Sequence, residues 1–418
     1  MNEPELRGAL RAARVTYSGA MYAPDPMQCA ERQLARDRLA TSDFPHLLPR
    51  KVERMSASPL AYLRGAAPLY YELLRDHPEL EQGPSGEGWL VGDAHLENFG
   101  AFKSADGKGA ESVVFDVNDF DEAIVGPFRW DVVRLLASVI LGGRELGSTG
   151  KQSVQLCGSI LEGYVPALCD GARPGDPPPA VRRLLKVVAE RSHKEFLDHR
   201  TERTSVDRAI SRRFLRGDRY QDLPPALVPQ AHQAFAEYVA HLDAAYTFAP
   251  DHFKVEDVAF RVAGNGSLGS LRIAVLTLGK GDIDNRWIFD MKSEGAPSGS
   301  ELAPAIPGPP AERVLKANLA CLEHPPRLAG TTTLGERSLF VRRLLPQEDK
   351  LDLTRMRREE LPDLARYLGA RLGFAHRRGA SSLPQARWTP QEQAALTDHA
   401  IVIAGLHEAS YLALCKSA

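Results

Sequence analysis

Residues 257–350 have the pattern of a β-sheet, whereas the sequence on both sides of them is mainly helical in pattern. Four β-branched or alternating runs and one helix are predicted within this segment: Val258–Val262, Leu271–Leu278, Trp287–Lys292, Ala311–Glu323 (the helix) and Ser338–Leu345. We therefore predict an α+β fold with two unequal lobes. Residues 1–256 form a large helical lobe, residues 257–350 a small β-rich lobe, and residues 351–418 helices that return to the large lobe. A cleft between two lobes is the usual place for a ligand.

Within the large lobe, the pattern predicts a short β region among helices. The predicted strands are Trp89–Gly92, Phe99–Lys103 and Val113–Val117, with a hairpin turn at residues 105–107. The predicted helices include Pro59–Leu74, a segment from Arg129 that continues helically to about residue 248 and contains Ala180–Asp198, and the two tail helices Arg358–Arg377 and Thr389–Leu414. Any candidate site in residues 92–122 therefore lies at the ends of short strands.

Composition restricts the class of protein more than its fold. Of the 418 residues, 43% are hydrophobic and 25% are charged, and the net charge is −2. These values are those of an ordinary soluble domain and predict neither a nucleic-acid partner nor a membrane partner. Five scattered cysteines without a CxxC pair favour a reducing compartment, and no apolar leader is apparent. We expect a cytoplasmic protein.

The first candidate site is the segment Gly92–Phe99 (GDAHLENF). Asp93 is followed five residues later by Asn98, just before a predicted strand, which is the spacing of a kinase catalytic loop. In such a loop the aspartate accepts the proton of an attacking hydroxyl, and the asparagine oxygen binds Mg²⁺. The spacing alone is also compatible with an ordinary turn, because Gly, Asp and Asn are common turn residues.

The second candidate site, Phe115–Glu122 (FDVNDFDE), contains four carboxylates within seven residues. Like charges at this density repel each other unless a cation or a basic side chain neutralises them, so a metal ion is a natural partner. Both Asp116 and Asp119 are candidate metal ligands. A solvated acidic turn is the alternative interpretation.

These two segments carry a resemblance to known families. Gly92–Asn98 is similar to the GDxHxxN loop of aminoglycoside phosphotransferases and choline kinases, and Asp119–Glu122 resembles their D-F/W-E segment. Those families also have an aspartate at a helix start twelve residues after the metal aspartate, and Asp131 occupies that position, which favours Asp119 over Asp116 as the metal ligand. In that pattern His95 more often braces the loop than acts as a base or a metal ligand.

A wider resemblance covers most of residues 40–380. Here the chain is similar to a bacterial family of uncharacterised proteins assigned to the protein-kinase-like superfamily. The matching segments are SPLAYLRG (58–65), GDAHLENFG (92–100), FDVNDFDEAIVGPFRWD (115–131), GNGSLGS (264–270) and FVRRLL (340–345). The resemblance implies a kinase-like fold, ATP and Mg²⁺ as cofactors, and transfer to an unidentified acceptor.

The third motif, Gly264–Gly269 (GNGSLG), is a G-x-G-x-x-G sequence. A dinucleotide-binding loop would be followed by a helix, but here a strand pattern follows. Strand, glycine loop and strand form the kinase arrangement, in which backbone N–H groups cover the ATP phosphates. The candidate nucleotide-binding residues are Gly264, Asn265, Gly266, Ser267 and Gly269. An ordinary hairpin is the alternative.

Lys292 ends the next predicted strand and is placed to reach the α- and β-phosphates, as the strand lysine of kinases does. A carboxylate must orient such a lysine. Glu312, at the start of the helix Ala311–Glu323, is our candidate, and Glu294 and Glu301 compete with it.

The order of these motifs differs from that of ordinary kinases, because the glycine loop and Lys292 follow the catalytic loop instead of preceding it. A circular permutation accounts for this order, since chain termini often lie close together at the surface. Residues 338–353 would then contain the last strand of the small lobe and the hinge.

The sequence thus predicts an ATP- and Mg²⁺-dependent phosphotransferase acting on a hydroxyl of a small molecule or protein. Three alternatives stay open at this point: a nucleotide-binding pseudokinase with a regulatory role, a kinase-fold enzyme that transfers AMP, and a metal-dependent phosphohydrolase. Retention of Asp93, Asn98, Asp119 and Lys292 together disfavours the pseudokinase, and the hydrolase leaves the glycine loop unexplained.

Overall fold

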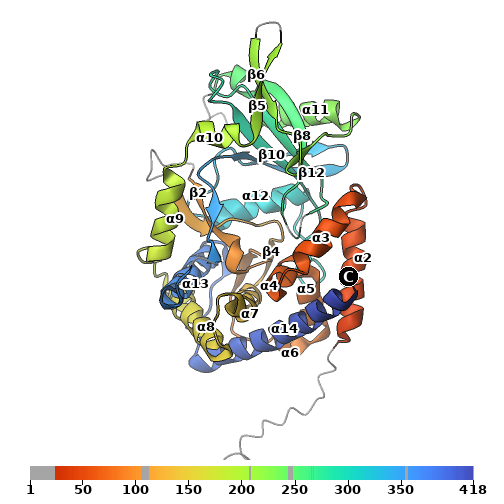
Figure 1. Cartoon of the computed structure of the whole chain (residues 1–418). Coiled ribbons are helices and arrows are strands. Elements are labelled where there is room, and N and C mark those ends of the chain that lie inside the picture. Colours follow the sequence, from red (N-terminus) through yellow and green to blue (C-terminus); the bar gives the residue numbers. More distant parts are fainter. Residues whose placement is uncertain are drawn as a thin grey trace, which may run out of the picture.

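The fold is α+β, with antiparallel sheets and many helices (Figure 1). The structure is a computed structural model and describes residues 24–104, 113–206, 209–242, 248–264, 266, 268–353 and 356–417. The predicted turn at residues 105–107 lies outside these residues. Among the described helices, none combines the length and the apolarity that crossing a membrane requires.

The helices are α2 Pro26–Ala40, α3 Leu48–Met55, α4 Pro59–Gly65, α5 Ala67–Asp76, α6 Pro78–Glu81, α7 Arg129–Glu145, α8 Gly150–Val165, α9 Pro179–Ala189, α10 His193–Asp198, α11 Leu227–Ala240, α12 Pro310–Cys321, α13 Leu361–Arg378 and α14 Pro390–Ser417. The strands are β1 Glu87–Leu90, β2 Phe99–Lys103, β3 Val113–Val117, β4 Ile124–Pro127, β5 Thr201–Val206, β6 Ala209–Phe214, β7 Tyr220–Gln221, β8 Val255–Arg261, β9 Arg272–Thr277, β10 Trp287–Glu294, β11 Gly330–Leu334, β12 Arg337–Leu344, β13 Asp349–Lys350 and β14 Ala380–Ser382.

A helical body occupies the lower half of Figure 1 and is organised around α7, which is buried on nearly every side. The backbones of helices α8 and α13 approach each other so closely that no side chain fits between them at two positions. A Cβ atom added to Gly163 would lie 1.9 Å from the carbonyl oxygen of Arg366, and one added to Gly369 would lie 2.0 Å from that of Ile160. Because no side chain fits there, these glycines permit the close packing that fixes α13 beneath β3.

Two small sheets in the helical body carry the loops of the candidate site. Strand β1 lies between β14 and β4, and β2 lies between β13 and β3. The predicted strands around residues 89–117 are confirmed, but β1 pairs with β4 and β14 and not with β2. The chain therefore changes sheet at residues 91–98, which leaves that loop free to line a cavity.

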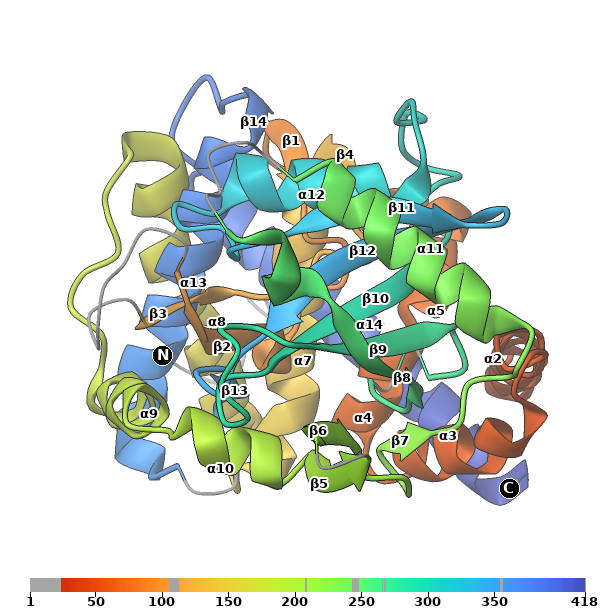
Figure 2. The same ribbon diagram turned by 90° about the horizontal axis from the view of Figure 1, so that it is seen from above.

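The second part is a six-stranded antiparallel sheet with the order β11-β12-β10-β9-β8-β7, which we call the upper sheet. Seen from above, α11 crosses its outer face (Figure 2), and residues of α11 share a hydrophobic core with β8–β12. Its other face, which includes Tyr220 of β7, packs on Phe196, Leu197 and Phe214. Residues that precede position 257 in the sequence therefore also pack against this sheet.

The predicted helical segments are shorter than expected. Pro59–Leu74 is two helices that meet at Ala66, because Pro68 has no N–H to bond to the carbonyl of Arg64. Ala180–Asp198 is also two helices, and the Ser192 hydroxyl caps the second by accepting from the backbone N–H of Glu195. Strands β5 (Thr201–Val206) and β6 (Ala209–Phe214) form an antiparallel pair, where the sequence predicted helix.

The connection between α2 and α3 contacts the upper sheet. The ring of Phe44 stacks on that of Phe260 in β8 with centroids 4.0 Å apart, and Leu47 belongs to the same core. Asp43 also pairs with Arg337 of β12 at 2.8 Å. Residues 43–47 thus join the helical body to the sheet on the side where α2 and α3 lie (Figure 1).

Candidate active site

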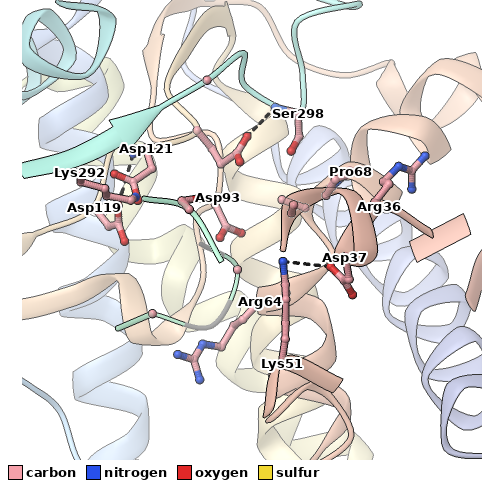
Figure 3. Close-up of a pocket in the computed structure, with 18 of the residues that line it drawn as sticks. Arg36, Asp37, Lys51, Arg64, Pro68, Asp93, Asp119, Asp121, Lys292 and Ser298 are labelled. Carbon is pink, nitrogen blue, oxygen red and sulfur yellow. Dashed lines mark hydrogen bonds and ion pairs between the residues drawn. The ribbon is translucent and has the colours of Figure 1, made fainter. Parts of the chain in front are cut away.

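A polar cavity of about 790 Å³ lies between the helical body and the upper sheet. Its walls come from α2–α5, the loops at residues 93–98 and 119–122, the glycine segment after β8, and the end of β10. Asp93, Asn98, Asp119 and Lys292 all line it, although up to 199 positions separate them in the sequence. Figure 3 shows Lys292, Asp119 and Asp121 together, with Asp93 between them and a second group of residues from α2 and α3.

The loop that carries Asp93 is fixed from behind by Asp131, in the first turn of α7. The carboxylate of Asp131 accepts from the backbone N–H of Val91 at 2.6 Å and of Gly92 at 3.0 Å, and from Nε2 of His376 at 2.9 Å. Asp131 is only 1% exposed. The position predicted from the twelve-residue spacing is therefore an anchor for the loop.

Gly92 is required by two features of this loop. Its φ is +83°, in the left-handed region, and an added Cβ would lie 1.8 Å from the backbone oxygen of Glu122. We expect Gly92→Ala to destabilise the protein by at least about 1–3 kcal/mol, the cost of one strained backbone position. Urea unfolding followed by circular dichroism measures this, with Gly158→Ala as the control.

Gly158 lies within α8 with nothing within 4 Å of an added Cβ. The control variant should be neutral or more stable, by up to about 1 kcal/mol, because alanine favours a helix. Equal effects of the two substitutions would contradict the packing of Gly92 against Glu122.

Asp93 is held by Arg134 of α7, which is fully buried. Nε of Arg134 donates to Oδ1 of Asp93 at 2.7 Å, and Nη2 donates to the same oxygen and to the carbonyl of Leu63. Burial raises the pKa of Asp93 to about 7, and the contact with Arg134 acts in the opposite direction. With Oδ1 engaged by Arg134, Oδ2 is the oxygen left for a ligand.

His95 braces this loop. Its Nδ1 accepts from the backbone N–H of Glu97 at 3.1 Å, and its Nε2 lies 3.7 Å from Oδ2 of Asp93, which is beyond hydrogen-bonding distance. Burial, followed by the charge of Arg64, holds the pKa of His95 well below its usual value. A neutral imidazole with Nδ1 engaged by the backbone fits bracing better than acid–base chemistry.

Asn98 and Asp119 supply the oxygens that could bind a metal. The Asn98 side chain donates through Nδ2 to the backbone oxygen of Asp93 at 2.8 Å, which leaves its Oδ1 as the ligand atom. Asp116 does not line the cavity: it is buried beside Arg371, 3.6 Å away, and accepts from the N–H of Val117. Within the described part of the chain, no three His, Cys, Asp or Glu side chains are grouped as a metal site.

The structure brings Lys292 to acidic partners other than the predicted Glu312. Its ammonium contacts the carboxylate of Asp121 and lies 3.6 Å from Glu294, the competing candidate two residues along β10. Burial raises the pKa of Glu294 to about 7, against the effect of Lys292. Glu312 is instead directed to Lys316 one helical turn later, at 3.1 Å, and lines no part of the cavity.

The residue of helix α12 that contacts the acidic loop is Arg313 and not the predicted Glu312. Arg313, the residue after Glu312, donates to the backbone oxygens of Ala123 at 2.6 Å, Asp121 at 2.8 Å and Gly295 at 3.1 Å. This side chain ties the acidic loop to the end of β10 and so fixes Asp121 beside Lys292.

The glycine segment lies on the cavity, where Gly264 and Gly266 form part of its wall. Gly269 has a φ of +105° and faces Ala40 and Thr41, so it packs against α2 and does not line the cavity. Two further candidates, Asn265 and Ser267, lie outside the described residues. Arg54 of α3 donates to the backbone oxygen of Gly264, which holds the segment against the helical body.

The structure adds cavity residues that the sequence analysis did not single out. They include Gln33, Asp37 and Lys51 on α2 and α3. Arg134, which holds Asp93 from behind, was not singled out either. Arg64 of α4 also lines the cavity and pairs with Glu97 of the loop at residues 93–98, at 2.8 Å. In the sequence, Lys51 resembles an exposed lysine on the surface of a helix, but its side chain is only 3% exposed.

Comparison with known proteins places the chain in a family. The family model described as "Uncharacterized protein conserved in bacteria (DUF2252)" matches residues 43–417. The chain belongs to the DUF2252 family. The match includes Asp93, Asn98, Asp119 and Lys292, and helix α2 precedes it. No curated protein and no solved structure matches this DUF2252 chain.

Proposed function

We propose that this DUF2252 protein is an ATP- and Mg²⁺-dependent phosphotransferase with a circularly permuted kinase-like fold. The observation that carries the proposal is the meeting of Asp93, Asn98, Asp119 and Lys292 around one cavity, with Gly264 and Gly266 in the same wall. These are the residue types that phosphoryl transfer requires for the acceptor, the metal and the phosphates.

The topology supports the proposal. A strand, a glycine segment, a second strand, a lysine-bearing strand and a helix follow one another as β8, residues 262–271, β9, β10 and α12. This is the order of parts expected in the nucleotide-binding lobe of a kinase. After β12 the chain returns to the helical body, where β13 pairs with β2 directly after the loop of Asp93.

In this proposal Oδ2 of Asp93 takes the proton of the acceptor hydroxyl as the new oxygen–phosphorus bond forms and ADP leaves. Arg134 keeps the Asp93 carboxylate oriented, and Lys292 exchanges its contact with Asp121 for the phosphates. Arg54 and Arg64 add positive charge beside the glycine segment.

The residues present fit Mg²⁺. Asn98 Oδ1 and the Asp119 carboxylate are hard oxygen ligands, and Mg²⁺ is commonly held by one or two such groups together with substrate phosphates. A bound Mg²⁺ would neutralise charge on those phosphates.

Replacing Lys292 tests the nucleotide site. Lys292→Ala should weaken Mg-ATP binding by about 1.5–3 kcal/mol, the contribution of a hydrogen bond to a charged group, as measured by calorimetric titration. Lys316→Ala is the matched control, because that lysine is half exposed on α12 and pairs only with Glu312 among the described contacts. Equal Mg-ATP affinity of the wild type and Lys292→Ala would remove Lys292 from the site.

The products distinguish this function from its alternatives. Incubation with ATP and candidate acceptors, followed by mass spectrometry, should give ADP and a phosphorylated acceptor. A product carrying AMP would indicate adenylyl transfer, and free phosphate without any modified acceptor would indicate a phosphohydrolase. Binding of ATP without turnover would indicate a pseudokinase.

A further inference from the structure

Three polar side chains form a buried group in the cavity wall: Gln33 and Asp37 of α2 and Lys51 of α3. Figure 3 shows Asp37 and Lys51 on the side of Asp93 away from Lys292. Nζ of Lys51 lies 3.0 Å from Oδ1 of Asp37, and Nε2 of Gln33 donates to the same oxygen at 3.0 Å. The three residues are between 2% and 3% exposed. We call them the α2–α3 triad.

The triad has unused hydrogen-bonding capacity. Nε2 of Gln33 is held by Asp37 and by the backbone oxygen of Gly65 at 3.3 Å, but its Oε1 has no partner in the described part of the chain. A buried acceptor without a partner costs free energy, so such atoms call for a specific explanation. Lys51 has three N–H groups, of which the contact with Asp37 engages one.

A contribution to stability does not account for the triad. A buried ion pair is weak support for a fold, because the loss of hydration offsets most of the attraction, and apolar residues of similar volume stabilise a protein equally well. The triad also borders a polar cavity and not the hydrophobic core. Both facts favour a role in binding.

We propose that the α2–α3 triad is the acceptor subsite and that it binds a small molecule with several hydroxyl groups, such as a sugar or another polyol. This inference rests on the proposed function. Lys51 and Asp37 neutralise each other, so the triad does not require a charged ligand. Gln33 Oε1 needs a donor, and the ammonium of Lys51 needs an acceptor. A hydroxyl group supplies both.

The position of the triad relative to Asp93 agrees with this assignment. In Figure 3, Asp93 lies between Lys292 and Asp119 on one side and the triad residues Asp37 and Lys51 on the other. A molecule bound to the triad would therefore present a hydroxyl to Asp93 from the side opposite Lys292 and Asp119.

The test is calorimetric titration of the full-length protein, without nucleotide, with glycerol, glucose, glucosamine and myo-inositol, and in parallel with serine-containing peptides. Saturable binding of at least one polyol is expected, and Gln33→Met should weaken it about tenfold or more by removing one buried acceptor. The control Gln233→Met makes the same change at an exposed position of α11 and should leave the affinity unchanged. If Gln33→Met fails to fold, Lys51→Gln provides the same comparison.

Binding of the peptides but of no polyol would overturn the inference, and so would equal affinity of the wild type and the folded triad variant. A parallel titration with Mg-ATP separates this result from the proposed function. A protein that binds Mg-ATP but no polyol refutes only the acceptor assignment. A protein that binds a polyol through Gln33 but no Mg-ATP refutes only the phosphotransferase.

Discussion

Asp93→Asn is expected to lower the rate of phosphoryl transfer by about 10²–10⁴, the range for a positioned proton acceptor, while Mg-ATP affinity stays within a few-fold of wild type. The reason is geometric: Asp93 contacts Arg134 and faces the cavity through Oδ2, but it contacts neither Lys292 nor Asp119 in the described interactions. Single-turnover kinetics gives the rate, and calorimetric titration gives the affinity.

The pH dependence of the rate provides a second measure of the same residue. Only the ionised form of Asp93 can accept a proton, and burial raises its pKa to about 7. The rate should therefore fall with decreasing pH below about 7 and level off above it. The residual activity of Asp93→Asn should not show this decrease in rate below pH 7. A wild-type rate that does not change between pH 5 and 8 would exclude Asp93 as the base.

Asp119→Asn should have a different effect: the dependence of ATP binding on Mg²⁺ should be lost, and turnover should fall with it. Asp119 lines the cavity two positions before Asp121, the partner of Lys292, and with Asn98 it offers the oxygens for a metal. Loss of a charged ligand removes the neutralisation that the metal provides at the phosphates. Titrations with ATP in the presence and absence of Mg²⁺ measure this directly.

Asp116→Asn is the matched control for both substitutions. Asp116 is a buried aspartate of the same segment, but it lies beside Arg371 and away from the cavity. Its replacement should leave Mg²⁺-dependent binding intact. Equal effects of Asp93→Asn and Asp119→Asn on that binding would instead indicate a cluster of carboxylates acting together, as in a hydrolase.

The sequence predicted seven of the fourteen described strands, and it singled out candidate residues that line one cavity, because both depend on local spacing. Asp93 and Asn98 lie in one loop, and Asp131 lies at the start of the next helix, so chain distance limits their separation in space. The strands β9, β10 and β12 were predicted within two residues because each is a short apolar run. The α+β class followed from these patterns.

The partners of charged residues were not predictable in the same way. Lys292 pairs with Asp121, which is 171 positions earlier, and Asp93 pairs with Arg134 of another element. No periodicity encodes such contacts, since they arise only when elements distant in the sequence pack together. Glu312 was predicted to orient Lys292 because it lies in the first turn of α12. In the structure, the neighbouring residue Arg313 contacts the acidic loop instead.

The hairpin β5–β6 was missed because its charged residues resemble a solvated helix. Arg212 lies between Ser211 and Arg213, but it is buried and pairs with Asp198 and Asp284. The β-branched residues Thr201, Thr204, Val206 and Ile210 were the available signal for strands. The wall made by α2 and α3 had no such signal, because Gln33 and Lys51 look like surface residues in a single sequence.

The contact of residues 43–47 with the upper sheet limits how the molecule can move. The sheet is joined to the helical body through β13, which pairs with β2, and also through the stacked rings of Phe44 and Phe260 near α2 and α3. A rigid-body rotation about either connection would stretch the other. Ligand exchange must then occur through local displacement of short segments, such as the one Arg54 holds at Gly264, and disrupting the Phe44–Phe260 stack should speed exchange without altering the reacting groups.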